Sequence, residues 1–324
     1  MKDFLQFPKK IKKLNKNKRW LLLCLIAVYF VLIIVNVFIK SEIKKEKILP
    51  FNSSVKLSSY PLLNSVLGAD VSGDISSKIS PNISAEAAIV MDDQSNVILF
   101  SKNQNLRFSM ASTTKIMTAL TALDYFKLND ILTVKSEEVE GTVVGFKKDE
   151  RFFFEDLLYA MLLPSGNDAA LAIAQNFSGE EKEFVKKMNE NAKRFNLINT
   201  HYQDVAGLAD EEDYTTVTDL ARLASIAVKN QIFSRIVATE SKLITDITGL
   251  KKYKLLNLNK LLGTNGVNGI KTGFTDEAGG VLVTSRIKNG RKLIIIVMKS
   301  DDRFLDTQKL LNFVSDVTYL KLNQ

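Results

Sequence analysis

The sequence predicts an α+β domain, built as an antiparallel sheet flanked by helices with a helical insertion and preceded by one transmembrane helix. Three observations carry this prediction. Residues 20–39 are an uncharged run long enough to cross a bilayer. Within residues 81–324, strand-like apolar runs lie on both sides of a middle part that has helical spacing. Strands from both ends of the domain can then meet in one sheet, with the helical residues inserted between them.

The membrane segment is predicted from its length and its flanking charges. At about 1.5 Å per residue, residues 20–39 span roughly 30 Å, the thickness of a bilayer core. A cleaved signal peptide would have a shorter apolar region and a small-residue cleavage site, which this run lacks. Eight basic residues in 1–19 and four in 40–47 predict a cytoplasmic N-terminus. We therefore expect a single-pass protein of the cell membrane, with its large domain outside the cytoplasm.

The basic charge of the chain is concentrated near this segment. Residues 1–19 carry +7 and residues 40–47 carry +2, which leaves −1 of the total of +8 for the rest. The large domain therefore does not have the charge of a nucleic-acid-binding protein. Residues 40–80, rich in Ser, Lys and Asn, predict a flexible tether. A single Cys and a single His exclude a disulfide framework and a Cys/His zinc cluster, and we expect no metal or other cofactor.

The elements of the large domain follow from its periodicity. Apolar runs at 87–92 and 97–101 around a polar turn predict a hairpin, and 280–286 and 293–298 predict a second one. Helical spacing and stop signals predict helices over 113–127, 155–163, 168–177, 180–195, 219–229 and 303–320.

The first candidate for catalysis is the pair Ser112 and Lys115. Two residues three apart on a helix share a face, so a lysine amine can reach a serine hydroxyl and act as its base. The same spacing occurs at Ser41–Lys44, Ser53–Lys56 and Ser285–Lys288, but the first two lie in the tether and the third lies in a strand. Only Ser112 opens an amphipathic helix, where the helix dipole disfavours a charged lysine. A plain helix cap followed by a solvated lysine is the alternative interpretation.

Two further motifs stand in positions suited to a cleft. Ser165-Gly166-Asn167 follows Pro164 in a tight turn between two predicted helices, where it either faces a cleft or satisfies local backbone groups. Lys271-Thr272-Gly273 lies near a predicted sheet edge, where a Lys and a Thr can bind a carboxylate and Gly273 permits close approach of a ligand. An edge strand guarded by a lysine is the alternative.

Together and in this order, S-x-x-K, S-x-N and K-T-G are the signature of penicillin-recognising serine enzymes. The sequences around Ser112, Ser165 and Lys271 closely resemble those of serine D-alanyl-D-alanine carboxypeptidases, the low-molecular-weight penicillin-binding proteins. The resemblance runs from about Ile83 to Leu320. It implies a β-lactamase/transpeptidase-like fold, peptidoglycan stem peptides as substrates and β-lactams as covalent inhibitors.

The resemblance also implies roles in acyl transfer. Ser112 would attack the carbonyl between two D-Ala residues and form an acyl-enzyme, while Lys115 takes its proton. Ser165 would relay a proton to the leaving amine, and water would then release the shortened peptide. The backbone amides of Ser112 and Phe274 would form the oxyanion hole.

The remaining implied roles concern substrate binding. Asn167 would bind the substrate peptide, and Lys271 and Thr272, next to Gly273, would hold its terminal carboxylate. Arg303 resembles the family's distal arginine near the carboxylate subsite. The chain departs from the family in having Phe274 where His is frequent, and in lacking the Asn and Pro of the motif at 204–208.

Three other functions remain open on the sequence. A D,D-endopeptidase of the same fold would carry the same motifs. A β-lactamase is disfavoured because the second motif is Ser-Gly-Asn rather than Ser-Asp-Asn, and no Glu-x-x-Leu-Asn run is present. A non-catalytic envelope-binding protein is disfavoured because every catalytic position is filled. His201 lies outside the motifs and is expected to be structural.

Overall fold

A five-stranded antiparallel sheet is the centre of the computed structural model, which describes residues 80–136 and 139–316. Its first and last strands in the chain, β1 and β11, pair with each other, as the sequence predicts. In spatial order the sheet consists of β2 (Ile98–Lys102), β1 (Ala87–Asp92), β11 (Arg291–Ser300), β10 (Gly279–Lys288) and β9 (Val267–Thr275). Both predicted hairpins are confirmed, and β9 is an edge strand.

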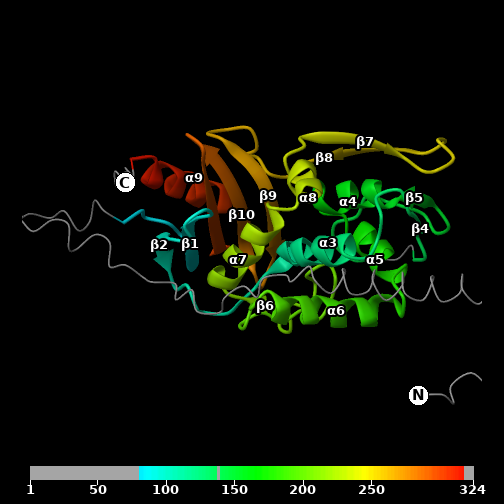
Figure 1. Cartoon of the computed structure of the whole chain (residues 1–324), viewed down its shortest axis with the longest axis horizontal. Helices are drawn as coiled ribbons and strands as arrows, with labels where there is room; N and C mark the ends of the chain where they lie inside the picture. The colour runs from blue at the N-terminus through cyan, green and yellow to red at the C-terminus, as the bar shows by residue number, and fades with distance from the viewer. Residues whose placement is uncertain (1–79, 137–138, 317–324) are drawn as a thin grey trace, which may run out of the picture. The chain divides into compact units, whose positions relative to one another are not determined.

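The sheet is buried on both faces, which explains the unbroken apolar runs in its strands. Along β1, Ile89 and Met91 pack into one hydrophobic cluster, whereas Ala88 and Val90 pack into a second. This is the two-residue alternation of a strand. The second cluster lies beneath α9 (Arg303–Phe313), and the first lies against the helical insertion (Figure 1).

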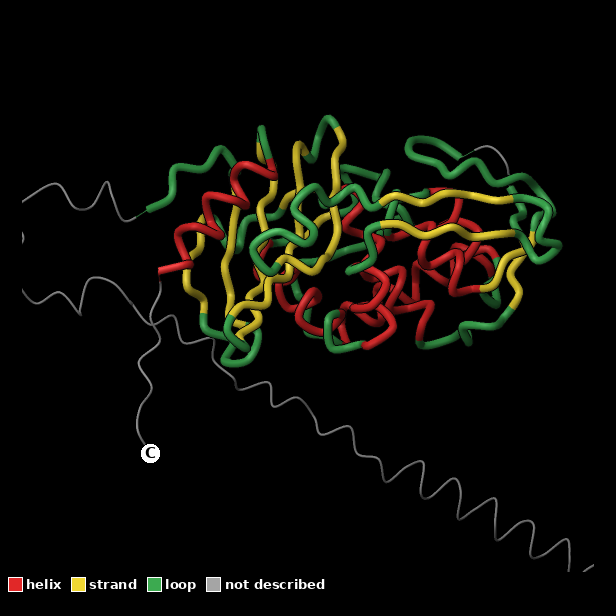
Figure 2. The backbone as a smooth tube through the Cα atoms, turned by 90° about the horizontal axis from the view of Figure 1, so that it is seen from above, coloured by secondary structure: helices red, strands yellow, loops and turns green. Residues whose placement is uncertain are grey.

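The helical insertion lies between β2 and β9, as predicted, and Figure 2 shows its helices gathered on one side of the sheet. Its helices are α3 (Lys115–Leu123), α4 (Phe154–Leu162), α5 (Asn167–Gln175), α6 (Glu180–Arg194), α7 (Val217–Ala227) and α8 (Gln231–Val237). The prediction missed the two-turn α8. It also made the first helix too long, because residues 111–114 form a separate 3₁₀ turn, η2, and α3 ends at Leu123.

Three two-stranded sheets were not predicted from the sequence. They are β3 (Phe108–Ser109) with β6 (Tyr214–Thr215), β4 (Ile131–Thr133) with β5 (Arg151–Phe153), and β7 (Ser241–Thr245) with β8 (Lys252–Leu256). Strands of two or three residues are too short to show a period. The β7–β8 pair mixes lysines with leucines on its exposed face, so it lacks a clear apolar stripe.

The predicted membrane helix and most of the tether lie outside the described residues. Among the residues that are described, no helix is both long and apolar enough to cross a bilayer. The predicted final helix is present as α9 from Arg303 to Phe313, followed by a 3₁₀ turn, η3, at Val314–Asp316.

One buried carboxylate ties both ends of the domain to the sheet. Asp306 on α9 accepts hydrogen bonds from the backbone amides of Ser84 and Ala85 and from the hydroxyls of Ser84 and Ser300. Burial raises the pKa of Asp306, but these hydrogen bonds outweigh it and leave the pKa below its usual value. The segment before β1, the end of β11 and α9 therefore share one charged anchor.

We expect Asp306→Ala to lower the free energy of unfolding by about 2–4 kcal/mol, because it leaves two backbone amides without an acceptor. Chemical denaturation of the domain measures this loss. Because the folded-state pKa is depressed, this contribution is present above the unfolded pKa and is lost as the pH falls through the folded value. Asp301→Ala, an exposed neighbour, is the control. Equal stability of the two variants would contradict the assigned role.

Candidate active site

The backbone geometry of η2 brings Ser112 and Lys115 together. In a 3₁₀ turn, side chains three residues apart eclipse one another. Ser112 lies in this turn, and Lys115 is the first residue of α3. Ala111, directly before Ser112, has a φ of 45°, a strained conformation for a residue with a side chain. The serine is therefore held at a sharp entry into the helix, with its hydroxyl 3.0 Å from the lysine amine.

The Lys115 amine is fully buried and makes three hydrogen bonds. It donates to Ser112 Oγ, to Asn167 Oδ1 at 2.7 Å and to the carbonyl of Ala206 at 2.8 Å. All three acceptors are neutral groups. Within the described residues, no carboxylate lies within ion-pair distance of this amine.

Burial lowers the pKa of Lys115 to about 7, so a large fraction of the amine is unprotonated at neutral pH. The nearby carboxylates of Asp204, Asp168 and Asp213 oppose this shift. Asp213 is itself buried, and burial together with the charge of Asp204 raises its pKa to about 8. At neutral pH the opposing negative charge therefore comes mainly from Asp204 and Asp168. A hydroxyl beside a neutral amine is the arrangement required for a serine nucleophile.

The Ser165 turn contributes the second wall of the site. Pro164 follows the end of α4, and Gly166 caps the start of α5 and donates its amide to the carbonyl of Ala160. Ser165 between them has a φ of 66°, and its hydroxyl is buried without a hydrogen-bond partner in the protein. A buried hydroxyl of this kind is available to a substrate.

Asn167 joins this turn to the lysine. Its amide oxygen accepts from Lys115, and its amide nitrogen donates to the carbonyl of Glu140 at 2.6 Å. Each polar atom of its side chain thus has one partner within the protein, and the amide nitrogen carries a second hydrogen. Contact of this group with a substrate peptide remains a prediction. What the structure shows is that Asn167 positions the amine of Lys115.

The loop over 204–209 carries functional residues that the sequence analysis did not identify. The carboxylate of Asp204 accepts hydrogen bonds from the four consecutive backbone amides of residues 206–209, at 2.5–2.7 Å. These bonds fix the loop so that the carbonyl of Ala206 reaches Lys115. Gly207 is required here, because a Cβ at this position would lie 1.9 Å from the carbonyl oxygen of Ala111. The only sequence signal was the departure of this segment from the family motif.

The backbone of strand β9 lies directly against the backbone of η2 at Ser112. A Cβ on Gly273 would lie 3.3 Å from the backbone nitrogen of Ser112, so a larger residue would separate the strand from η2. Lys271 and Thr272 are buried, whereas the Phe274 side chain is 62% exposed. The strand thus brings the third motif against the first, as the resemblance implies.

Two basic side chains, Lys271 and Arg303, lie beside this strand. Lys271 donates to the carbonyl of Thr272, and Arg303 donates to the carbonyl of Gly273 at 2.8 Å. Burial lowers the pKa of Lys271 well below its usual value, and the charges of Lys115 and Arg303 lower it further. Neither Lys271 nor Arg303 forms an ion pair with a carboxylate of the described residues. An anionic group bound here would oppose this shift and stabilise the charged form of Lys271.

Ser285 and His201, the other candidates that the structure describes, do not join this site. Ser41–Lys44 and Ser53–Lys56 lie outside the described residues, and Ser285 is buried within β10. His201 binds the carbonyl of Glu212 and stacks on Tyr214, consistent with a structural role. The described residues contain no group of three metal-binding side chains placed to hold an ion.

Replacing Asp204 by Asn should lower the pKa of Lys115 further, because it removes a negative charge that stabilises the protonated amine. The midpoint for deprotonation would then move to lower pH. NMR titration of ¹³C-labelled lysines, with the Lys115 signal assigned through Lys115→Arg, measures it. Glu212→Gln, an exposed residue near the same loop, is the control. A midpoint that is unchanged or higher in Asp204→Asn would refute this electrostatic role.

Comparison with known proteins agrees with the motifs. A family model described as D-alanyl-D-alanine carboxypeptidase, peptidase family S11, matches residues 75–302. The D-alanyl-D-alanine carboxypeptidase DacF of Bacillus subtilis is 33% identical over 240 residues, covering 71% of this chain and 61% of the relative. The D-alanyl-D-alanine carboxypeptidase of Streptomyces sp. strain K15 is 32% identical over 259 residues, covering 72% and 88%.

A solved structure shares the fold. The crystal structure of the Streptomyces K15 DD-transpeptidase matches with a TM-score of 0.70 and 31% identity, covering 74% of this chain and 99% of that one. The chain thus spans most of the Streptomyces enzyme but less than two thirds of the Bacillus one. With a family model matched across more than half of its length, the chain belongs to the D-alanyl-D-alanine carboxypeptidase family of serine peptidases.

Proposed function

We propose that this protein is a membrane-anchored serine D-alanyl-D-alanine carboxypeptidase, which removes the terminal D-Ala from peptidoglycan stem peptides through an acyl-enzyme on Ser112. The single observation that carries the proposal is the buried Lys115 amine, with its pKa near 7, hydrogen-bonded to the Ser112 hydroxyl. The residues around this pair supply the other functions that acyl transfer requires.

Acylation begins with proton transfer from Ser112 to the neutral amine of Lys115. As Oγ bonds to the carbonyl carbon of the penultimate D-Ala, charge develops on the carbonyl oxygen, which the backbone amides of Ser112 and Phe274 would stabilise. Ser165, whose buried hydroxyl has no partner in the protein, would pass a proton to the departing amine. Water then attacks the ester and releases the shortened peptide.

The substrate carboxylate would bind near the basic side chains of Lys271 and Arg303 beside β9. Lys271 and Arg303 lie close enough for the charge of one to lower the pKa of the other, and each bonds only a backbone carbonyl. An incoming carboxylate, also bonded by Thr272, would relieve this repulsion. These contacts would thus bind the terminal D-Ala, the residue that the reaction releases.

A β-lactamase function is disfavoured by the state of the carboxylates near Lys115. Class A β-lactamases hydrolyse the penicilloyl ester rapidly with a carboxylate that activates water. Asp204 has two backbone amides on each oxygen, and Asp168 accepts from the amides of residues 144–146. These groups act as structural anchors, so we expect the penicilloyl enzyme to persist.

Two alternatives use the same chemistry with another substrate or acceptor. A D,D-endopeptidase would cut crosslinked stem peptides, and one related structure bears the name DD-transpeptidase, in which an amine replaces water. Incubation with crosslinked muropeptides, and separately with a pentapeptide plus an amine acceptor, separates these products from simple release of D-Ala.

Replacing Ser112 by Ala should abolish both covalent labelling by a fluorescent penicillin and release of D-Ala from a pentapeptide, because the acyl-enzyme bond can no longer form. Intact-protein mass spectrometry and a D-Ala assay provide the measurements. Ser285→Ala is the matched control, since Ser285 is also followed by a lysine three residues later but lies in β10. Labelling that persists in Ser112→Ala would refute the assignment of Ser112 as the nucleophile.

We further propose that residues 20–39 anchor the protein, with residues 1–19 in the cytoplasm and residues 40–80 as a tether to a catalytic domain over 81–324. The support is the length of the uncharged run and the charges that flank it. The active domain would then work outside the cytoplasm, where stem peptides are found.

Deleting residues 1–47 should yield a soluble protein that retains penicillin labelling, since every residue of the active site lies beyond position 110. Sedimentation with membranes from cells expressing either form measures the change. The full chain should pellet with the membranes, and the truncated chain should stay in the supernatant. Complete membrane association of the truncated chain would mean that another segment is the anchor.

A further inference from the structure

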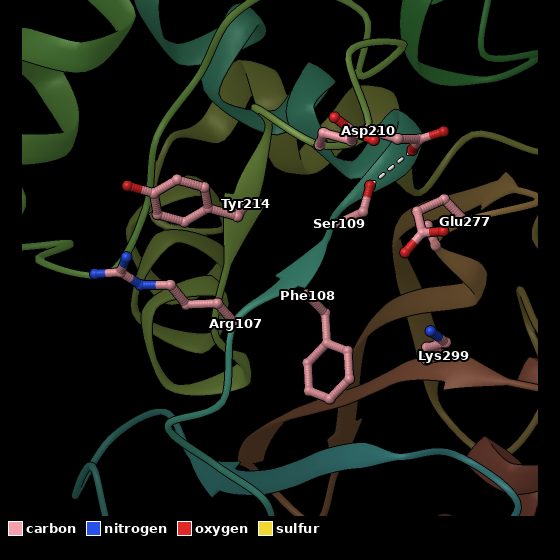
Figure 3. Close-up of a pocket in the computed structure, with 9 residues that line it drawn as sticks. Arg107, Phe108, Ser109, Asp210, Tyr214, Glu277 and Lys299 are labelled. Carbon is pink, nitrogen blue, oxygen red and sulfur yellow. Dashed lines mark hydrogen bonds between the residues drawn. The ribbon is translucent and has the colours of Figure 1, made fainter.

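A carboxylate that the proposed mechanism does not use links the segment of the nucleophile to β9. The side chain of Asp210 is half-buried, and one of its oxygens accepts hydrogen bonds from the hydroxyls of Ser109 and Thr275, each at 2.7 Å. Figure 3 shows the Ser109 hydroxyl directed at Asp210, in the wall of a polar cavity of about 450 Å³. Within the part of the chain that the structure describes, Asp210 forms no ion pair.

The two hydroxyls belong to the segments that carry the oxyanion-hole amides of the proposed mechanism. Ser109 is the last residue of β3 and lies three residues before Ser112. Thr275 is the last residue of β9 and directly follows Phe274. A single carboxylate oxygen therefore joins the two segments whose amides would stabilise the developing negative charge.

No direct hydrogen bond fixes the spacing of these two segments. Over residues 80–136 and 139–316, β9 pairs with β10, and none of the other backbone hydrogen bonds runs from β9 to β3 or η2. Gly273 lies against η2, but this is a contact between backbones that share no hydrogen bond. The bridge through Asp210 therefore supplies the directional link that the two segments otherwise lack.

The position of Asp210 is itself fixed by the backbone around it. The amides of residues 212 and 213 both donate to the carbonyl of Ala209 and close a turn around Asp210. Before this turn, the Ala209 amide donates to the carboxylate of Asp204. After it, β6 pairs with β3 and places Tyr214 opposite Ser109. The carboxylate therefore belongs to a turn that is held on both sides.

The Thr275 hydroxyl is oriented by a second hydrogen bond. Its oxygen accepts from the amide of Ala278 at 3.0 Å, within the turn that joins β9 to β10. A hydroxyl has one hydrogen, and here it is directed at Asp210. Hydrogen bonds thus run without a break from β3 through Asp210 to the β9–β10 turn.

We propose that Asp210 is a positioning residue for acylation, which holds the amide of Phe274 at the distance from the Ser112 amide that the oxyanion hole requires. It contacts no reacting atom and acts through the hydroxyls of Ser109 and Thr275. This inference rests on the proposed function, which assigns the oxyanion hole to these amides. Preorganised donors are effective because they need not move as charge develops, so a loosened spacing slows acylation and leaves ligand binding nearly unchanged.

Acylation of the full-length protein in detergent by benzylpenicillin tests this role, followed by rapid quenching and mass spectrometry. Asp210→Ala should lower the acylation rate constant at saturation about tenfold and leave the half-saturating concentration unchanged. Loss of a whole oxyanion donor costs about 10²–10³ in rate, and a misplaced donor costs less. Asp210→Asn keeps an oxygen that accepts both hydroxyls and should stay within about threefold of the unmutated enzyme. Glu277→Ala is the matched control, a carboxylate of the same cavity that bonds neither hydroxyl.

The infrared spectrum of the acyl-enzyme reports on the oxyanion hole directly. With ¹³C at the β-lactam carbonyl, the ester band is resolved from the protein, and hydrogen bonds from the two amides lower its frequency. Asp210→Ala should move this band to higher wavenumber. Ser109→Ala, which removes one of the two bonds, should move it less in the same direction. Adding Ser109→Ala to Asp210→Ala should change nothing further, because both act through the same carboxylate.

An unchanged ester band and acylation rate in Asp210→Ala would overturn the assignment, and so would additive losses in the double variant. An Asp210→Asn protein as slow as Asp210→Ala would overturn it as well. If Asp210→Ala does not fold, the band of Ser109→Ala alone decides. Release of D-Ala by the unmutated enzyme is scored separately. An enzyme that is labelled by penicillin but releases no D-Ala would contradict the proposed function and leave the test of Asp210 intact.

Discussion

The buried amine of Lys115 is the constraint around which the active site is built. The amine is not exposed to water and finds its hydrogen-bond partners on three separate segments of the chain. The charged form donates to all three, whereas the neutral form donates to two of them and accepts from the Ser112 hydroxyl. The 3₁₀ turn supplies the Ser112 hydroxyl, the start of α5 supplies the Asn167 amide, and the 204–209 loop supplies the Ala206 carbonyl. Satisfying this one group therefore fixes the relative positions of nucleophile, second motif and loop.

The chemical nature of those acceptors matters as much as their number. A carboxylate in direct contact would hold the lysine in its charged form, whereas a hydroxyl, an amide oxygen and a carbonyl permit the neutral form. The nearby carboxylates of Asp204 and Asp168 are instead bonded to backbone amides. They moderate the effect of burial on the pKa from a distance, and this leaves the value close to neutrality.

The sequence predicted the larger elements because their patterns are local. The unbroken apolar runs of β1 and β11 and the three motifs are each visible in a few consecutive residues, and the order of the motifs indicated the family. The helical spacing after Ser112 did not show where the 3₁₀ turn gives way to α3. The role of Asp204 arises from the fold of its loop, which depends on tertiary contacts that no short pattern records.

The pairing of β1 with β11 has a consequence for how the chain reaches its folded state. Ala87 pairs with Met298, so the two central strands come from opposite ends of the domain. On the ribosome, β1 and β2 are synthesised long before β11, the strand that pairs with β1. Until then, the apolar faces of this hairpin have nothing to pack against. Closing so long a loop is slow, and the unpaired edge is prone to aggregation meanwhile. The central sheet therefore cannot form until β11 has been made.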